Sequence, residues 1–363
     1  MKIKEITNFL EKLAPLEYSL DWDNCGLQVG NLKNNLGKIG IALTPTIEII
    51  EKSISNDCNL LITHHPLIFK AIKTIDINNP IGKMISLAMK NDLTIYTLHT
   101  NFDSASTGLN YNIAKGLGLD NIEVLSITGS LDNYKLVTFI PEEYTLKIIN
   151  ALSEAGAGNI GKFSHRGYIT AGITTFSNQN EPITNFETLD KESEDRLEMT
   201  VPKSKLNNVI NVLKENHPYE DVLYDIYKIE DKSNVYGIGT VGSFYTPFRL
   251  IEIINILKRN LNIPNLSFVG DPEKKIERVA ICTGSGASLM KDAKRKNADL
   301  YITGDIKYHD AIDAKEIDLA LIDATHYFTE IISVPFLSKY LKNNFNSNLQ
   351  IVELIEDNPF SYV

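Results

Sequence analysis

Apolar and polar positions in the first third of the chain alternate in short blocks. An apolar run at Ile39–Leu43 is followed by a helical pattern in PTIEIIEKSI, and the same pair recurs in NLLIT and the segment around Ile81–Lys90. The strand pattern LTIYTL and a helical pattern around Gly108–Gly116 complete the series. This alternation predicts a mostly parallel sheet that is covered by helices.

The last third of the chain repeats this order. VAICT, DLYIT and LALID are strand patterns, GSGASLMKDAKRKNA and KYHDAIDAKE lie between them, and one long helix is predicted from about His326 to Lys342. The segment CNLLITHHPLIFKAI (58–72) aligns without a gap on ADLYITGDIKYHDAI (298–312). Both place Leu-x-Ile-Thr at the end of a strand and a polar pair directly after it. We therefore predict an internal duplication, in which two α/β halves form one bilobal unit.

The middle of the chain has a different order. Strand patterns at Tyr134–Ile140, GYITAGITTF, RLEMTVP and DVLYDIYKIED are interrupted by helical patterns at Glu142–Glu154 and Lys203–Glu215. The order β-α-β-β-α-β predicts an inserted ferredoxin-like α+β domain. The polar run FSNQNEPITNFETLDKESEDR lacks apolar periodicity and is predicted to be a mobile loop within it. The predicted division is residues 1–127, an insertion at 128–235, and residues 236–363.

Composition and charge narrow the class of protein. Of the 363 residues, 43% are hydrophobic and 23% are charged, which is typical of globular proteins. The net charge of -10 disfavours direct binding to nucleic acid or to an anionic membrane. No apolar run approaches the roughly 20 residues that a membrane span needs. Three widely spaced cysteines indicate reduced thiols, so we expect a cytoplasmic protein.

Histidines and carboxylates are concentrated where three predicted strands end. The motifs THHP, HTNFDS and ATHYFTE follow these strands and supply His64, His65, His99, Asp103, His326 and Glu330. Ligands of open α/β sheets bind beyond the carboxyl ends of the strands, so these side chains are expected to meet. His326 and Glu330 are four residues apart at a helix start and therefore share one face.

This set of side chains predicts a metal centre. Imidazole and carboxylate groups without a thiolate suit zinc, iron, manganese or cobalt. Five ligands exceed what one tetrahedral site uses and suit two divalent ions about 3.5–4 Å apart with a bridging carboxylate or water. Adjacent residues of an extended backbone point in different directions, so His64 and His65 could serve different ions. The assumed roles are terminal ligation by His64, His65, His326 and Glu330, with Asp103 or Glu330 bridging.

Each of these residues also has a purely structural alternative. Asp103 could cap the helix that begins nearby, Thr325 could cap the helix that carries Glu330, and His99 could orient another ligand instead of binding metal. Four of the seven histidines fall in these three motifs, and this joint placement favours the metal site.

Two further segments are candidates for contact with a substrate. Lys307, Tyr308 and His309 follow a strand end and could act as acid–base or phosphate-contacting groups, or could simply be surface residues of a helix. The segment TGSGAS (283–288) could hold a phosphate at a helix start, or form a tight turn capped by serine.

Five motifs, in this order along the chain, resemble one known family. They are DWDNCGLQVG, LLITHHPLIFK, LHTNFDSASTGLN, ITGDIKYHDA and LIDATHYFTE. The chain resembles the GTP cyclohydrolase 1 type 2 homologues, also called the Nif-three-like family, almost from end to end. It is similar to the longer bacterial members, whose inserted domain is similar to the PII and CutA proteins, and HPYEDVLYDIYKIED (217–231) fits the last strand of such a domain.

The resemblance implies a dinuclear metal centre whose ligands are His64, His65, Asp103, His326 and Glu330. It also implies a toroidal homohexamer with metal sites facing an inner cavity and inserted domains capping the ring as trimers. Two positions depart from the family pattern, Thr325 and Thr283, where glycine is frequent; both substitutions could narrow the pocket.

Two functions from different classes follow. The first is a metal-dependent hydrolase of a nucleotide-like or other small phosphorylated or heterocyclic substrate, with cyclohydrolase-type ring opening as one case. The second is a non-catalytic metal-binding, metal-delivery or regulatory protein that assembles as a hexamer. The sequence leaves open whether there is turnover.

Overall fold

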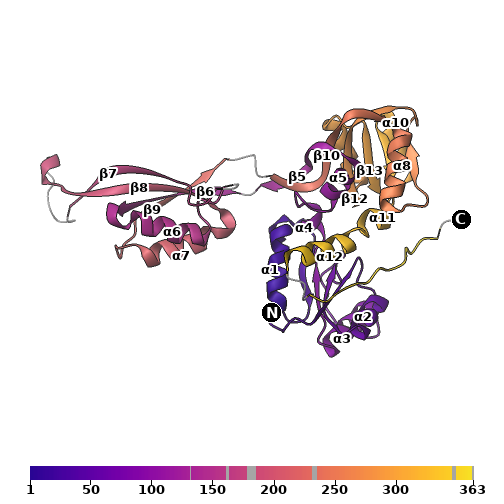
Figure 1. The fold of residues 1–363 in the computed structure, drawn as a ribbon, viewed down its shortest axis with the longest axis horizontal. Helices are drawn as coiled ribbons and strands as arrows, with labels where there is room; N and C mark the ends of the chain where they lie inside the picture. The colour runs from indigo at the N-terminus through magenta and orange to yellow at the C-terminus, as the bar shows by residue number, and fades with distance from the viewer. Residues whose placement is uncertain (131, 161–162, 178–184, 231–234, 346–348, 362–363) are drawn as a thin grey trace. The chain divides into compact units, whose positions relative to one another are not determined.

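The computed structural model describes residues 1–130, 132–160, 163–177, 185–230, 235–345 and 349–361. The chain divides into two compact units, each shown in Figure 1. The first unit comprises Met1–Gly129 and Tyr236–Val363, and the second comprises Ser130–Val235. The first unit contains two sheets with parallel central strands. Each sheet together with the helices that cover it is called a lobe, the first or the second in chain order.

The first lobe is built on a five-stranded sheet with the order β1-β4-β3-β2-β15. Its strands are β1 (Gly26–Val29), β2 (Lys38–Ala42), β3 (Cys58–Thr63), β4 (Thr94–Thr97) and β15 (Ile351–Glu353). All neighbours are parallel except β1, which pairs antiparallel with β4. Figure 1 shows the helices that cover this sheet, α1 (Ile3–Leu13), α2 (Ile47–Ser55), α3 (Pro80–Lys90) and α12 (Ser333–Asn344).

Both faces of this sheet are covered, and this explains its apolar strands. Residues of α1 and α12 pack on one face, while those of α2 and α3 pack on the other. Leu60, Leu61 and Ile62 are consecutive in β3 and completely buried, because alternate side chains point into two different cores. Burial of each such side chain stabilises the fold by about 1.5–3 kcal/mol.

The second lobe is built on a six-stranded sheet with the order β11-β14-β13-β12-β10-β5. Its strands are β5 (Asp120–Ser130), β10 (Val235–Arg249), β11 (Ser267–Val269), β12 (Lys275–Ser285), β13 (Leu300–Gly304) and β14 (Ala320–Asp323). Its helices are α5 (Leu109–Leu117), α8 (Leu250–Leu261), α9 (Met290–Arg295) and α10 (Tyr308–Glu316). Residues of α5 and α8 pack on one face, and those of α9 and α10 pack on the other.

The two lobes share the topology of their central strands. In the second lobe β12, β13 and β14 are parallel neighbours, and β11 pairs antiparallel with β14. The first lobe has the same arrangement in β2, β3 and β4, with β1 antiparallel to β4. The aligned segment 58–72 begins at the start of β3, and the aligned segment 298–312 begins just before β13. Strands β3 and β13 are the central strands of these two trios.

The second unit is a four-stranded antiparallel sheet with two helices. Its elements are β6 (Asn133–Pro141), α6 (Thr145–Ala155), β7 (Gly167–Phe176), β8 (Asp190–Pro202), α7 (Leu206–Asn216) and β9 (Tyr224–Ile229). The strand order β7-β8-β6-β9 and the sequence β-α-β-β-α-β are those of a ferredoxin-like domain. The predicted fold class, a bilobal α/β unit with mostly parallel sheets and an inserted ferredoxin-like domain, is confirmed.

Two local predictions need correction. The polar run 176–196 is only partly a loop, because Asp190–Arg196 belongs to β8 and pairs with β7. Cross-strand hydrogen bonding does not require apolar alternation, so the sequence pattern did not indicate this part of the strand. Residues 178–184 of the run lie outside the described residues. The helix predicted from His326 to Lys342 is divided into α11 (His326–Glu330) and α12. Pro335 causes this division, because its ring clashes with the carbonyl of Ile331 in a continuous helix.

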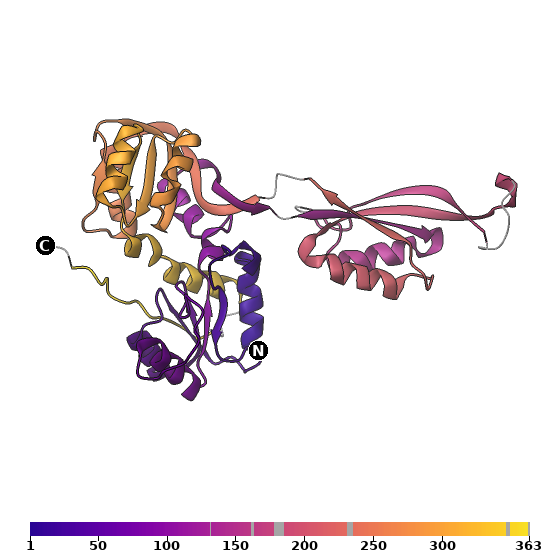
Figure 2. The same cartoon turned by 180° about the vertical axis from the view of Figure 1, so that it is seen from behind.

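Short elements complete the described part of the chain. They are α4 (Thr100–Asp103) and the 3₁₀ helices Leu16–Tyr18, Glu142–Tyr144, Phe186–Thr188, Lys203–Lys205 and Ala287–Leu289. Figure 2, which shows the fold from behind, makes clear that the C-terminal segment leaves the first lobe after β15 and runs towards the second lobe. None of the helices formed by the described residues combines the length and the apolar character needed to cross a membrane.

Candidate metal centre

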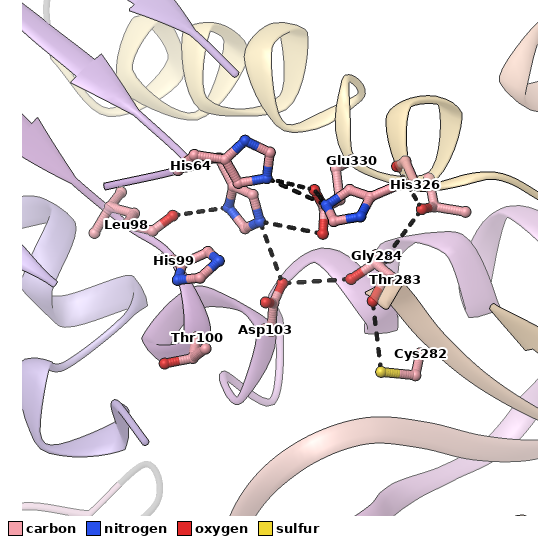
Figure 3. Close-up of polar contacts among 12 residues, drawn as sticks. His64, Leu98, His99, Thr100, Asp103, Cys282, Thr283, Gly284, His326 and Glu330 are labelled. Carbon is pink, nitrogen blue, oxygen red and sulfur yellow. Dashed lines mark hydrogen bonds and ion pairs between the residues drawn. The ribbon is translucent and has the colours of Figure 1, made fainter. Parts of the chain in front are cut away.

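The carboxyl ends of three strands bring imidazole and carboxylate groups from both lobes together (Figure 3). His64 and His65 follow β3, and Asp103 lies at the end of α4, directly after β4. His326 and Glu330 occupy the first and last positions of α11, which follows β14. The cluster therefore depends on the packing of the two lobes against each other within the first unit.

The carboxylate of Glu330 lies at the centre of this cluster. Its Oε2 atom is 2.9 Å from His65 Nε2 and 2.8 Å from His326 Nε2, while its Oε1 atom is 3.7 Å from His64 Nε2. Glu330 is only 3% exposed. Burial opposes the charged form, but the three imidazoles outweigh it and hold the pKa of Glu330 well below its usual range. The two oxygens of one carboxylate thus face different histidines.

His64 has a ring nitrogen without a hydrogen-bond partner. The side chain is completely buried, and Nδ1 donates to the carbonyl oxygen of Leu98 over 2.8 Å. Nε2 has no partner, since Asp103 Oδ1 and Glu330 Oε1, at 3.8 and 3.7 Å, are beyond hydrogen-bond distance. Buried polar atoms are rarely left unsatisfied without a reason. In the neutral ring Nε2 carries a lone pair, so this atom is suited to bind a metal ion.

The other two imidazoles are oriented in the same manner. His65 Nδ1 is 2.9 Å from the Thr44 hydroxyl, and His326 Nδ1 is 2.7 Å from Asp305 Oδ2. In both rings Nε2 is directed at Glu330. A polar partner on the distal nitrogen fixes the ring and is typical of histidines that bind metal.

The prediction that His64 and His65 serve different ions stays a prediction, although the extended backbone from which it was argued is not present at this pair. Their ring centroids are 5.4 Å apart, and both rings approach the same carboxylate. Strand β3 ends at Thr63 and the backbone bends at the histidine pair, so the alternation of an extended strand no longer applies.

His99 lies next to the cluster and is oriented by a buried carboxylate. Its Nδ1 atom is 2.9 Å from Asp23, which also accepts a hydrogen bond from the Thr100 hydroxyl. Burial opposes the charged form of Asp23, but these bonds outweigh it and lower its pKa. Asp23 lies in the segment DWDNCGLQVG, and its role was not evident from the sequence.

The donor atoms form two groups that share one residue. The ligand atoms of His64, His65 and His99 lie within 4.8 Å of one another, and so do those of His65, His326 and Glu330. Their nitrogen and oxygen donors fit zinc, iron or manganese. The thiol of Cys282 is buried and directed at the carbonyl oxygen of Thr283, and burial raises its pKa. The donor set and the unpartnered His64 Nε2 therefore fit bound divalent ions.

The glycine-rich end of β12, at Thr283–Ser285, packs directly behind the carboxylates. Gly284 has a φ of +63°, and a Cβ at this position would overlap Glu330 Oε1. The Thr283 hydroxyl donates to Asp103 Oδ1 over 3.4 Å, and the Gly284 N–H donates to the Thr329 hydroxyl. This part of TGSGAS thus supports the side chains of the cluster.

Comparisons with known proteins identify the family of this chain. Residues 1–359 match the family model described as Duf34/NIF3 (NGG1p interacting factor 3). The chain belongs to the Duf34/NIF3 family. It is 34% identical over 367 residues to the "GTP cyclohydrolase 1 type 2 homolog" of Bacillus subtilis, covering 99% of this chain and 98% of that protein. The homologue from Halalkalibacterium halodurans is 31% identical, with 99% and 98% covered.

Solved structures of family members have the same fold. A Bacillus cereus protein described as related to NIF3 superposes with a TM-score of 0.87 at 32% identity, covering 100% of this chain and 99% of that one. A Staphylococcus aureus protein superposes with a TM-score of 0.78 at 29% identity, with 100% and 99% covered. The resemblance inferred from the five motifs is therefore confirmed.

Not every candidate residue lies at the cluster. The structure brings together His64, His65, His99, Asp103, His326 and Glu330. Lys307, Tyr308 and His309 instead lie at the exposed start of α10, and no described hydrogen bond or ion pair joins them to the cluster.

Asp305 contacts the cluster, although the sequence did not indicate this role. It stands 240 positions after His65 in the aligned repeat, so the repeat itself placed a polar side chain at this strand end. In the structure it adopts a φ of +57° and contacts His326.

Thr325, which replaces the glycine frequent in the family, adopts a φ of +62°. This backbone region favours glycine and is unusual for a β-branched residue. The Thr325 hydroxyl accepts a hydrogen bond from Phe328 N, and Asp323 Oδ1 accepts one from the Thr325 N–H. These bonds hold the turn that presents His326.

A cleft opens beside the cluster. It has a volume of about 720 Å³ and is lined from both lobes and by the C-terminal segment. His65 and His326 form part of its wall, and the His326 side chain is 37% exposed. A small molecule in this cleft would reach the open side of the cluster.

Replacing Asp305 with asparagine is expected to weaken metal binding by about 10- to 100-fold. Asparagine tolerates the positive φ of this position, so the backbone is preserved while the negative charge that orients His326 is removed. Competition with a chelator of known affinity measures the change. Asp57→Asn, at an exposed residue that also has a positive φ, is the matched control, and an equal loss in both variants would contradict the prediction.

The metal-free protein is expected to become less stable as the pH rises from 7 to 9. The Asp103 and Glu330 carboxylates outweigh burial and raise the pKa of His64 to about 9, and the hydrogen bond to Glu330 raises that of His326 to about 9. A folded-state pKa above the ordinary value of 6.5 gives stability that is complete below pH 6.5 and lost as the pH rises through 9.

Two other groups of the cluster titrate outside this range. Burial raises the pKa of Asp103 to about 6, and burial lowers that of His65 from 6.5. Urea unfolding in the presence of chelator at pH 7, 8 and 9 measures the expected loss of stability of the metal-free protein. Stability that rises with pH over this range would contradict the assignment. Because metal ions displace these protons, the apparent metal affinity should increase over the same range.

Proposed function

We propose that this protein is a dinuclear metal-dependent hydrolase that acts on a small heterocyclic or phosphorylated substrate. The observation that carries the proposal is a pair of ligand groups that share His65 beside an open cleft. One group is His65, His326 and Glu330, and the other is His64, His65 and His99, with Asp103 Oδ1 3.8 Å from His64 Nε2. The proposed ligands are His64, His65, Asp103, His326 and Glu330, with Glu330 bridging. The proposed cofactors are two zinc, iron or manganese ions for each chain.

Several features support catalysis over a structural role. Structural zinc sites are usually closed and four-coordinate, whereas this cluster has more donors and a side open to the cleft. Divalent ions, when bound, supply Lewis-acid activation of water for hydrolysis. The Leu98 carbonyl and the Asp305 carboxylate accept hydrogen bonds from Nδ1 of His64 and His326, which leaves Nε2 of both rings for metal, and burial excludes water from His64. The name of the two relatives, "GTP cyclohydrolase 1 type 2 homolog", is consistent with hydrolytic ring opening.

Metal content is the experiment that tests the proposal. About two equivalents for each chain, measured by mass spectrometry on gently purified protein, are expected. His64→Ala and His326→Ala should each reduce this number while the circular dichroism spectrum is retained, and His165→Ala, which changes an exposed histidine of the second unit, should not. One equivalent or none in the parent protein, with all variants alike, would overturn the dinuclear hydrolase. Metal-loaded protein is then screened for hydrolysis of nucleotides, phosphoesters and cyclic amides.

One observation favours a second function, reversible metal binding without turnover. His326 is exposed to the cleft, so an ion held there could exchange without unfolding of the site. Rapid loss of metal to a competing chelator, together with no hydrolysis of any compound in the screen, would favour metal delivery or regulation. Slow exchange together with turnover would favour the hydrolase.

We also propose assembly as a homohexamer, with residues 128–235 as an inserted PII/CutA-like domain between the halves 1–127 and 236–363. The support is the resemblance to the longer bacterial members of the family. Light scattering coupled to size exclusion, which gives the mass of the assembly, tests this proposal.

A further inference from the structure

We infer that the cleft beside the metal centre receives an uncharged or cationic compound rich in hydrogen-bond donors, and that a polyphosphate such as GTP is not its substrate. The inference rests on the proposed function, because it concerns the molecule that would reach the bound metal ions. It goes beyond that function by assigning the chemical class of the substrate. The side chains that line the cleft carry the argument.

The described walls of the cleft contain two aspartates and neither lysine nor arginine, and their basic groups are the candidate metal ligands His65 and His326. The two aspartates are Asp305 and Asp323. Sites for triphosphates hold the phosphate oxygens with lysine, arginine or a free helix N-terminus. The helix nearest the cleft, α11, is short and is capped by Thr325. A triphosphate in this cleft would therefore meet like charge without a compensating partner.

Bound metal ions do not reverse this balance. Two divalent ions bring four positive charges, and the carboxylates of Asp103, Glu330, Asp305 and Asp323 bring four negative ones. Asp305 keeps its charge at the surface of the cleft, because its side chain is 47% exposed while Oδ2 contacts His326. The C-terminal segment that forms one wall adds Glu356 and Asp357 nearby in the chain.

Lys307 is the basic residue that follows Asp305 most closely in the sequence. It lies at the exposed N-terminus of α10 and is not among the residues that line the cleft. The position of Lys307 therefore does not supply the missing phosphate contact within the described structure.

The remaining walls suit a neutral ring compound. The amide group of Asn265 supplies hydrogen-bond donors and an acceptor, while Tyr327 and Phe360 supply aromatic surface. Phe360 is 70% exposed and so is available for contact with a ligand. A volume of about 720 Å³ is in the range of small-molecule sites. Cyclic amides, amidines and nucleobases without phosphate match these walls.

The C-terminal wall is held in place by defined contacts. Glu356 Oε1 accepts a hydrogen bond from Thr44 N over 2.5 Å, and the Tyr327 hydroxyl donates to the Glu356 carbonyl oxygen over 2.6 Å. Because Thr44 also contacts His65, the same residues fix the wall of the cleft and a candidate ligand. These contacts hold Glu356, two residues before the lining residues 358–361.

Binding of guanosine, GMP and GTP to metal-loaded protein tests the inference, because these three probes share a ring and differ in charge. Isothermal titration calorimetry is expected to show guanosine binding at least about tenfold more tightly than GTP, with GMP between them. Asn265→Lys and Ser361→Lys add a cation to two different walls and should each tighten GTP binding by about tenfold or more. Asn343→Lys, at an exposed position of α12, adds the same charge elsewhere and should leave all three affinities unchanged.

The outcomes distinguish this inference from the proposed function. Metal content is measured first on every sample, and parent protein without two metal ions would overturn the proposed function itself. Protein that retains both ions but binds GTP more tightly than guanosine would overturn only the inference. Failure of all three probes to bind at millimolar concentration, with both ions retained, would also overturn it.

Discussion

Glu330→Gln is expected to remove at least nine tenths of the metal that the parent protein retains against a chelator. The carboxylate of Glu330 is close to three histidines, at 2.8 Å from His326, 2.9 Å from His65 and 3.7 Å from His64. Glutamine preserves the shape of the side chain but removes the negative charge and one of the two acceptor oxygens. A loss of affinity of about 100-fold or more is expected, which corresponds to about 2.8 kcal/mol.

The same substitution should also affect the metal-free protein. The raised pKa values of His64 and His326 depend on this carboxylate, so the loss of stability between pH 7 and 9 should become smaller in the variant. Glu48→Gln is the control, because Glu48 forms an exposed ion pair with Lys52 and such pairs contribute about 1 kcal/mol or less. Two retained equivalents of metal in Glu330→Gln would show that Glu330 is not a bridging ligand.

Gly284→Ala is expected to destabilise the protein by about 2–4 kcal/mol and to lower its metal content. Part of the cost comes from a φ of +63°, which alanine adopts only with strain. The larger part comes from overlap of the new Cβ with Glu330 Oε1, since neither the end of β12 nor the buried carboxylate can move freely. Urea unfolding and metal analysis measure the two effects on the same sample.

Gly116→Ala provides the matched control for this variant. Gly116 lies in α5, its φ is in the ordinary range for a helix, and a Cβ there would meet no atom within 4 Å. Alanine at such a position should stabilise the helix by about 0.5–1 kcal/mol. If Gly284→Ala were as stable as Gly116→Ala and kept its metal, the close packing of Gly284 against Glu330 would not be important for the site.

The convergence of the side chains named from the sequence has a physical cause. His64, His65 and Asp103 follow strands whose apolar runs are unmistakable, because both faces of each sheet are covered. Parallel strands place their carboxyl ends at one edge, so residues directly after them converge without any knowledge of loop structure. The spacing of His326 and Glu330 predicted a shared helix face, and their 2.8 Å contact agrees with it.

Residues whose roles depend on the approach of distant segments were not evident from the sequence. Asp23 orients His99 across 76 positions of the chain, and Asp305 orients His326 across 21. Both are ordinary acidic residues in polar segments, so no local pattern distinguishes them. The bend that turns His64 and His65 towards one carboxylate is also invisible in the sequence, because it begins where regular structure ends.

The sequence by itself determined the fold class, the duplicated order of strands and helices, the family and the residues that converge on one edge. These properties follow from the periodicity of apolar side chains and from motifs that are contiguous in the chain. Tertiary structure alone decided that Glu330 lies among three imidazoles and that His64 Nε2 is left without a partner. It also decided that Asp305 and Asp323, but no described lysine or arginine, line the neighbouring cleft. Such features depend on distances between the two lobes, which local hydrophobic and polar patterns do not encode.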